Sequence, residues 1–115
     1  MLIDKARLFN EFAGDEEILA ELRDTFLSEL PKMMSAIEVA IKDGNAKGLE
    51  HSAHTLKGAV SNFQTQKVKD AAFALENQGR QGSLDGAPAN FETLKQLMSE
   101  LQNELATLTS KNASR

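Results

Sequence analysis

Apolar residues recur at alternating steps of three and four along most of this 115-residue chain, which is the period of an amphipathic helix. Five segments carry the pattern: a short one between Asp4 and Gly14, and longer ones at about 16–43, 46–63, 66–79 and 88–108. Asp4, Asp15 and Asn45 stand where they can cap the first three segments at their N-termini. Good helix formers are plentiful and strand formers are sparse. The pattern therefore predicts an all-α protein.

The longest segment contains Pro31 near its middle. A proline there removes one backbone hydrogen bond, so it either kinks a continuous helix or begins a new one, and the pattern leaves both open. Four longer amphipathic helices joined by short loops favour an antiparallel four-helix bundle, with the short N-terminal helix covering one end. We expect one domain over residues 1–115, a core over about 2–108, and a polar tail, 109–115, that frays.

Composition narrows the classes of function. The net charge of −4 and the lack of a basic block argue against nucleic acid as a partner. The absence of cysteine excludes disulfides and thiolate metal sites. The chain has neither the apolar run of a signal peptide nor the roughly 20 apolar residues of a membrane span. We therefore expect a cytoplasmic protein without a membrane partner. Apolar stripes suit a bundle or a dimer equally, and we expect a monomer.

Both histidines of the chain lie in one predicted helix, and His54 has the more informative neighbours. It follows Ala53 of the apolar stripe, so it lies about 100° around the helix from the core. Lys57 and Gly58 are its neighbours at i+3 and i+4, and Ser61 continues the same line. A cation there opposes protonation of the imidazole and attracts a phosphoryl group. Gly58 costs about 1 kcal/mol against Ala in a helix, so it indicates either space beside the histidine or close helix packing.

Four stretches of the chain carry a resemblance: His54-Thr55-Leu56-Lys57-Gly58, Phe26-Leu27-Ser28-Glu29-Leu30-Pro31, Ala40-Ile41-Lys42-Asp43-Gly44-Asn45 and Leu75-Glu76. They resemble the H-x-x-K-G, F-L-x-E-x-P, A-x-x-x-G-D/N and L-E motifs of bacterial histidine-containing phosphotransfer (HPt) domains. The similarity covers about residues 2–108 in the expected order. One departure is Phe63-Gln64-Thr65, where the family often has a glycine near position 64.

The resemblance implies a continuous kinked helix through Pro31 and an exposed His54 on the third helix. It implies that His54 accepts a phosphoryl group from an aspartate of a response-regulator receiver domain and passes it to another receiver, or back. Lys57, Gly58 and Ser61 would support the phosphoryl group. Such a carrier has no turnover of its own and needs no cofactor or metal, because the divalent cation belongs to the partner receiver. A hybrid sensor histidine kinase is a further candidate partner.

Several simpler interpretations remain open from the sequence. His51 is the alternative acceptor, although it lacks a lysine at i+3, and it also suits a docking surface. With His54 and Glu50 it could hold a metal, but no Cys or third His completes such a site. Leu27 and Met34 lie beside the main stripe and either widen the core or belong to a docking surface. A helical interaction module that binds a receiver without phosphoryl transfer is the competing function.

Overall fold

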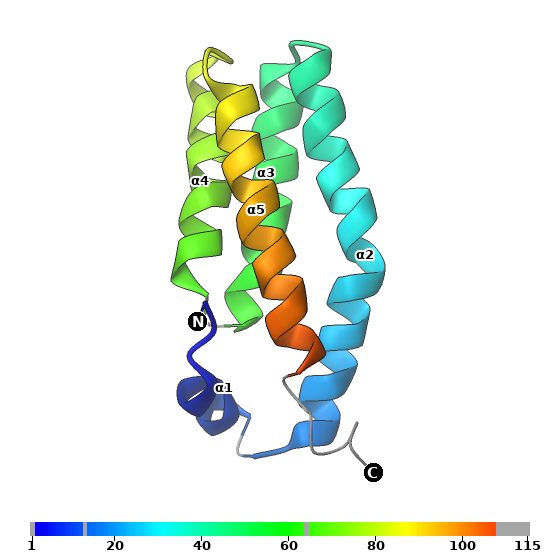
Figure 1. Ribbon diagram of the computed structural model, residues 1–115. Coiled ribbons are helices and arrows are strands. Elements are labelled where there is room, and N and C mark those ends of the chain that lie inside the picture. Colours follow the sequence, from blue (N-terminus) through cyan, green and yellow to red (C-terminus); the bar gives the residue numbers. More distant parts are fainter. Residues whose placement is uncertain (1, 13, 64, 108–115) are drawn as a thin grey trace.

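The structure, a computed structural model, describes residues 2–12, 14–63 and 65–107. These residues form helices and no strands, which confirms the predicted all-α class. The elements are α1 (Lys5–Glu11), α2 (Glu16–Lys42), α3 (Ala46–Val60), the short 3-10 helix η1 (Ser61–Phe63), α4 (Gln66–Gln81) and α5 (Ala87–Ala106). Helices α2 to α5 run up and down in alternation, and α1 lies at the end of the bundle where α2 begins and α5 ends (Figure 1).

The helix limits follow local signals in the sequence. The side chains of Asp4, Asp15 and Asn45 each accept a hydrogen bond from the backbone N–H three residues later, at distances of 2.9–3.1 Å. Helix α2 continues through Pro31, which decides between the two predicted paths in favour of one helix. The predicted fraying tail lies outside the described residues. None of the described helices combines the length and the apolar character that a membrane span needs.

The apolar stripes meet in a single core. The predicted stripe of the third segment is fully buried over its whole length: Leu49, Ala53, Leu56, Val60 and Phe63. Its last member belongs to η1, and the Phe63 ring packs against Phe26 of α2 with ring centroids 5.2 Å apart. Because this stripe faces inward, the residues between its members lie on the surface of α3.

The first residues of the described chain are tied to the last helix. The backbone N–H groups of Leu2 and Ile3 donate to the two carboxylate oxygens of Glu104, at 2.7 and 2.9 Å. Glu104 is only 8% exposed, and burying a carboxylate without hydrogen-bond partners would cost free energy. These two bonds supply the partners. The N-terminal segment is thereby held against α5.

Helices α3 and α4 pack closely against each other at Gly79. A methyl group there would collide with backbone atoms of α3, namely the N and Cα of Glu50 and the carbonyl oxygen of Ala46. At Gly58 the result is different, because an added Cβ would meet no atom within 4 Å. Close helix packing therefore explains Gly79 and does not explain Gly58, which borders open space on the outer side of α3.

These two glycines form a matched pair for measurement. We expect Gly79→Ala to lower the free energy of unfolding by about 1–3 kcal/mol, because the two helices must move apart. We expect Gly58→Ala to raise it by about 0.5–1 kcal/mol, because Ala is the better helix former and has room. Urea unfolding of both variants tests this, and equal effects at the two positions would contradict the packing described here.

Candidate functional site

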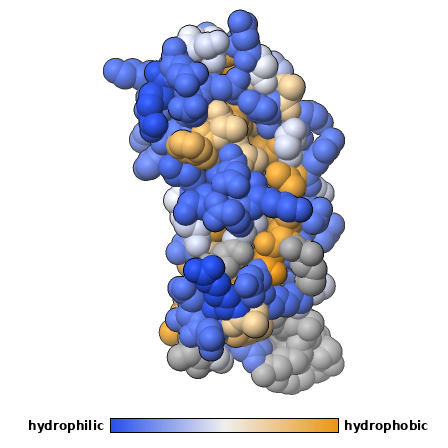
Figure 2. Space-filling model, turned by 90° about the vertical axis from the view of Figure 1, so that its left-hand side faces the viewer, coloured by the Kyte–Doolittle hydropathy of each residue, from blue (hydrophilic) through white to orange (hydrophobic). Residues whose placement is uncertain are grey.

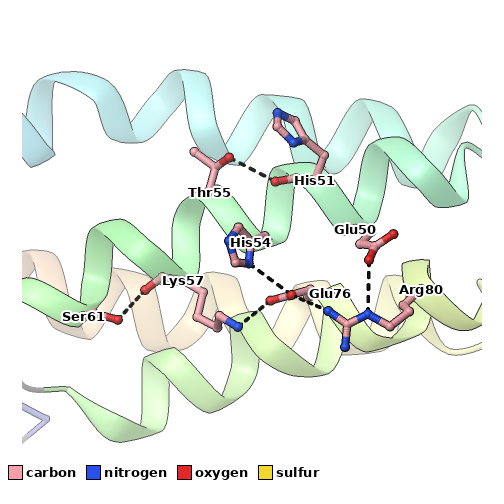
Figure 3. Close-up of polar contacts among 8 residues, drawn as sticks. All are labelled: Glu50, His51, His54, Thr55, Lys57, Ser61, Glu76 and Arg80. Atoms are coloured by element: carbon pink, nitrogen blue, oxygen red, sulfur yellow. Dashed lines mark hydrogen bonds and ion pairs between the residues drawn. The ribbon is translucent and has the colours of Figure 1, made fainter.

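The polar residues of the predicted site gather between α3 and α4. His54 and Lys57 come from the outer side of α3, and Glu76 and Arg80 reach toward them from α4 (Figure 3). The exposure of the side chains differs sharply: that of His54 is 65% exposed, whereas that of Glu76 is 3% exposed. A buried carboxylate therefore lies directly beneath an exposed imidazole.

Glu76 is the centre of this network. Its Oε2 lies 3.1 Å from Nδ1 of His54 and 2.8 Å from Nη2 of Arg80, and its Oε1 lies 2.8 Å from Nζ of Lys57. Arg80 also donates from Nε to Oε2 of Glu50 at 3.1 Å, which adds a third link between α3 and α4. Three nitrogen groups thus surround one buried carboxylate, which is the arrangement that a buried charge requires.

The charge state of Glu76 follows from these contacts. Burial raises the pKa of its carboxyl group, but the hydrogen bonds from Lys57 and His54 and their positive charges act in the opposite direction. The net result is a pKa below the ordinary value of 4.5. Glu76 is therefore ionised at neutral pH, and an ionised carboxylate can only accept hydrogen bonds.

This acceptor selects one form of the neutral imidazole of His54. The nitrogen that faces Glu76, Nδ1, must carry the proton in order to donate. In a neutral ring the lone pair then lies on Nε2, the nitrogen that Glu76 does not engage. Because the side chain is mostly exposed, the arrangement presents a nucleophilic nitrogen at the surface.

Lys57 makes two contacts that its spacing does not predict, and its support of a phosphoryl group stays a prediction. Its ammonium bonds to Glu76 and lies 4.9 Å from the centroid of the Phe73 ring. Because Glu76 contacts both side chains, it links the ammonium of Lys57 to the imidazole of His54. The hydroxyl of Ser61, the first residue of η1, donates to the carbonyl oxygen of Lys57 in α3 at 2.8 Å. The predicted support of a phosphoryl group by Ser61 stays a prediction.

Two hollows border α3. An open one of about 660 Å³ lies between α3 and α4, and His51 and His54 both line it. An apolar groove of about 310 Å³ lies between α2 and α3. The groove is lined chiefly by Leu22, Phe26, Met33, Thr55, Ala59 and Phe63.

The three residues predicted for a docking surface lie in different environments. His51 is exposed beside His54. Leu27 and Met34 are partly buried against the core, as one of their two interpretations expects, and they do not line the groove. Their part in docking stays a prediction. Within the described ranges, no three His, Cys, Asp or Glu side chains are grouped to hold a metal ion.

The sequence placed Glu76 only in the Leu75-Glu76 motif and Glu50 only in a possible metal site, and it assigned no role to Arg80. The available signal was the spacing of Glu76 and Arg80, four residues apart and next to the buried Leu75 and Gly79. A charged residue so close to an apolar stripe is a candidate for burial. The pattern does not tell which helix it faces, so its contact with His54 needed the structure.

The lowered pKa of Glu76 gives a test by pH. Glu76→Gln keeps the shape but removes the charge that binds Lys57 and Arg80, so we expect the free energy of unfolding at neutral pH to fall by about 1–3 kcal/mol. A carboxyl group whose pKa is depressed by folding stabilises the protein above its unfolded-state pKa and loses that contribution as the pH falls through the folded-state value. The difference between wild type and variant should therefore shrink below about pH 4.5.

Urea unfolding over a pH series measures this difference. Glu92→Gln is the control, because Glu92 is 61% exposed in its ion pair with Lys95 and should contribute little at any pH. A stability difference for Glu76→Gln that stays constant into the acid range would contradict the assigned charge state.

Comparison with known proteins shows the family of the chain. A family model of the Hpt domain matches residues 21–104. The structure is similar to histidine-containing phosphotransfer protein B (HptB) from Pseudomonas aeruginosa PAO1, with a TM-score of 0.87 over 96% of each chain. The sequences are 24% identical, so this likeness shows the fold. No curated protein matches the chain. Since the family match spans most of the chain and includes the site, this protein belongs to the Hpt domain family, the histidine phosphotransfer domains of phosphorelays.

Proposed function

We propose that this protein is a phosphorelay carrier that accepts a phosphoryl group on Nε2 of His54 from a receiver aspartate and passes it to another receiver, or back. The observation that carries the proposal is the bond between Nδ1 of His54 and the ionised, buried Glu76. That bond leaves Nε2 as the free nitrogen of an exposed ring. Membership of the family supports histidine phosphotransfer as the chemistry.

The transfer balances without a separate proton acceptor. The lone pair of Nε2 attacks the phosphorus of an aspartyl phosphate in line, an N–P bond forms, and the P–O bond to the aspartate breaks. The aspartate leaves as a carboxylate with the bonding electron pair. The ring keeps its proton on Nδ1 and becomes cationic, and the carboxylate of Glu76 stabilises that charge from beneath. Transfer onward is the same step in reverse.

Positive charge beside the ring comes from two side chains. Lys57 and Arg80 both contact Glu76, so each is held next to the imidazole before the phosphoryl group arrives. Their donors suit phosphoryl oxygens, and their charge offsets part of the added negative charge. The open space at Gly58 leaves room for the partner on the same side of α3.

The partner receiver supplies the rest of the catalytic machinery. We expect the divalent cation and the phosphorylated aspartate to belong to the receiver, and the carrier to have no turnover and no cofactor of its own. The apolar groove between α2 and α3, whose lining includes Thr55, gives a receiver an apolar surface to bury on the helix that carries His54. Labelling by a panel of phosphorylated receiver domains would identify the receivers, and a hybrid kinase that carries one of them.

His54→Gln tests the acceptor. We expect this variant to take up no phosphate from a panel of phosphorylated receiver domains, while wild type gains acid-labile, alkali-stable label. His51→Gln is the matched control and should label as wild type does, because His51 lacks the bond to Glu76. Mass spectrometry and acid treatment read the outcome.

Other outcomes of the same experiment have clear meanings. Label that survives in His54→Gln and disappears in His51→Gln would reassign the acceptor to His51. Receiver binding without label in wild type would favour the interaction module over the carrier.

Lys57→Ala tests the neighbouring charge. We expect transfer from the receiver to slow about tenfold or more, since a charge-assisted contact of about 1.5–3 kcal/mol is lost where charge accumulates. The bundle should remain folded, because the Lys57 side chain is not part of the apolar core. Rapid-quench kinetics and the lifetime of the phosphorylated form measure the effect, and wild-type values for both would remove Lys57 from the mechanism.

A further inference from the structure

An exposed aromatic residue lies beside the site without a part in the mechanism described above. Phe73 is 44% exposed on α4. The face of the molecule on the side of α4 is mainly hydrophilic, with apolar patches between the polar groups (Figure 2). Exposed single apolar residues are common on protein surfaces, so exposure alone assigns no role. The contact that Phe73 makes is more informative.

The Phe73 ring is one of two groups that hold the ammonium of Lys57. Nζ lies 4.9 Å from the ring centroid and 2.8 Å from Oε1 of Glu76. A phenyl face attracts a cation through its quadrupole, and a carboxylate attracts it through its charge. The Lys57 side chain is 22% exposed, so the ring and the carboxylate also exclude much of the surrounding water.

This double contact matters because a lysine side chain is flexible. Four rotatable bonds allow an unrestrained ammonium to spend much of its time in solvent, away from the imidazole. The ion pair with Glu76 keeps the ammonium of Lys57 close to that carboxylate, and the Phe73 ring limits the directions in which the ammonium can move. An ammonium that is partly desolvated also acts more strongly on a nearby charge.

We propose that Phe73 is a positioning residue for phosphoryl transfer, which keeps the ammonium of Lys57 beside the His54–Glu76 pair. The proposal rests on the proposed function and extends it by one residue. Phe73 acts through Lys57, so its effect on the transfer rate requires both an aromatic ring at position 73 and the lysine. If Phe73 only packed against the bundle, or bound the partner directly, its effect would require neither the aromatic ring nor Lys57.

The first experiment measures the contact without any phosphoryl transfer. Because Nζ of Lys57 lies 4.9 Å from the centroid of the Phe73 ring, we expect NMR to show the protons of the neighbouring ε-methylene shifted upfield in wild type. Phe73→Tyr should keep this shift and Phe73→Leu should remove it. Lys95, whose ammonium lies 5.3 Å from the Phe91 ring on α5, is an internal control that should stay unchanged. An identical Lys57 shift in wild type and Phe73→Leu would overturn the proposal.

The second experiment measures transfer from a phosphorylated receiver. We expect Phe73→Leu to slow transfer about threefold to tenfold, and Phe73→Tyr to remain near wild type. Adding Phe73→Leu to Lys57→Ala should slow transfer little further, because the ring has no ammonium left to hold. Ile18→Ala, at a residue 51% exposed in the first turn of α2, controls for loss of an exposed apolar side chain.

The results separate the possible roles of Phe73. A rate for Phe73→Leu equal to wild type, or an independent further loss in the double variant, would overturn positioning; the second result would assign Phe73 to direct contact with the partner. A wild-type protein that no receiver labels would overturn the proposed function, and with it any role of Phe73 in transfer. The NMR series would still report whether the ring holds the lysine.

Discussion

One buried carboxylate links the packing of this bundle to its chemistry. Glu76 is almost fully removed from water, and it remains ionised because Lys57, Arg80 and His54 each direct a nitrogen toward it. Removing these partners would leave an uncompensated buried charge, which is among the costliest features that a protein interior can contain. The same requirement fixes the orientation of the imidazole. On the proposed function, stability and reactivity at this site therefore depend on the same contacts.

The distances in the site depend on how closely α3 and α4 approach. Gly79 permits that approach one turn beyond Glu76, where a side chain would collide with the backbone of α3. Arg80, the next residue, spans the two helices by contacting Glu50 on α3 and Glu76 on its own helix. Side chains on two rigid, closely packed helices are held more accurately than side chains on loops. The bundle thus supplies the precision that a transfer between two proteins requires.

Much of this architecture could be predicted from local sequence signals. Helix limits depend on residues within one turn, so Asp4, Asp15 and Asn45 marked them correctly, and the apolar stripes identified the core. Contacts between distant segments could not be predicted in the same way. The bond from Leu2 to Glu104 spans 102 positions, and no periodic pattern encodes such a pairing. The contact of Glu76 with the histidine likewise depends on the rotation and approach of two helices.

A carrier must hold its phosphoryl group weakly enough to release it, and the resting contacts of Glu76 contribute to that balance. Lys57 and Arg80 are already paired with a carboxylate before His54 is modified. On the proposed function, phosphorylation lets these two side chains exchange contacts with Glu76 for contacts with the phosphoryl group. The free energy gained is the difference between the two sets of contacts, which is smaller than the full value of either. The cationic ring formed by transfer is matched by the same carboxylate. On the proposed function, this matching reduces the preference for either state, as transfer in both directions requires.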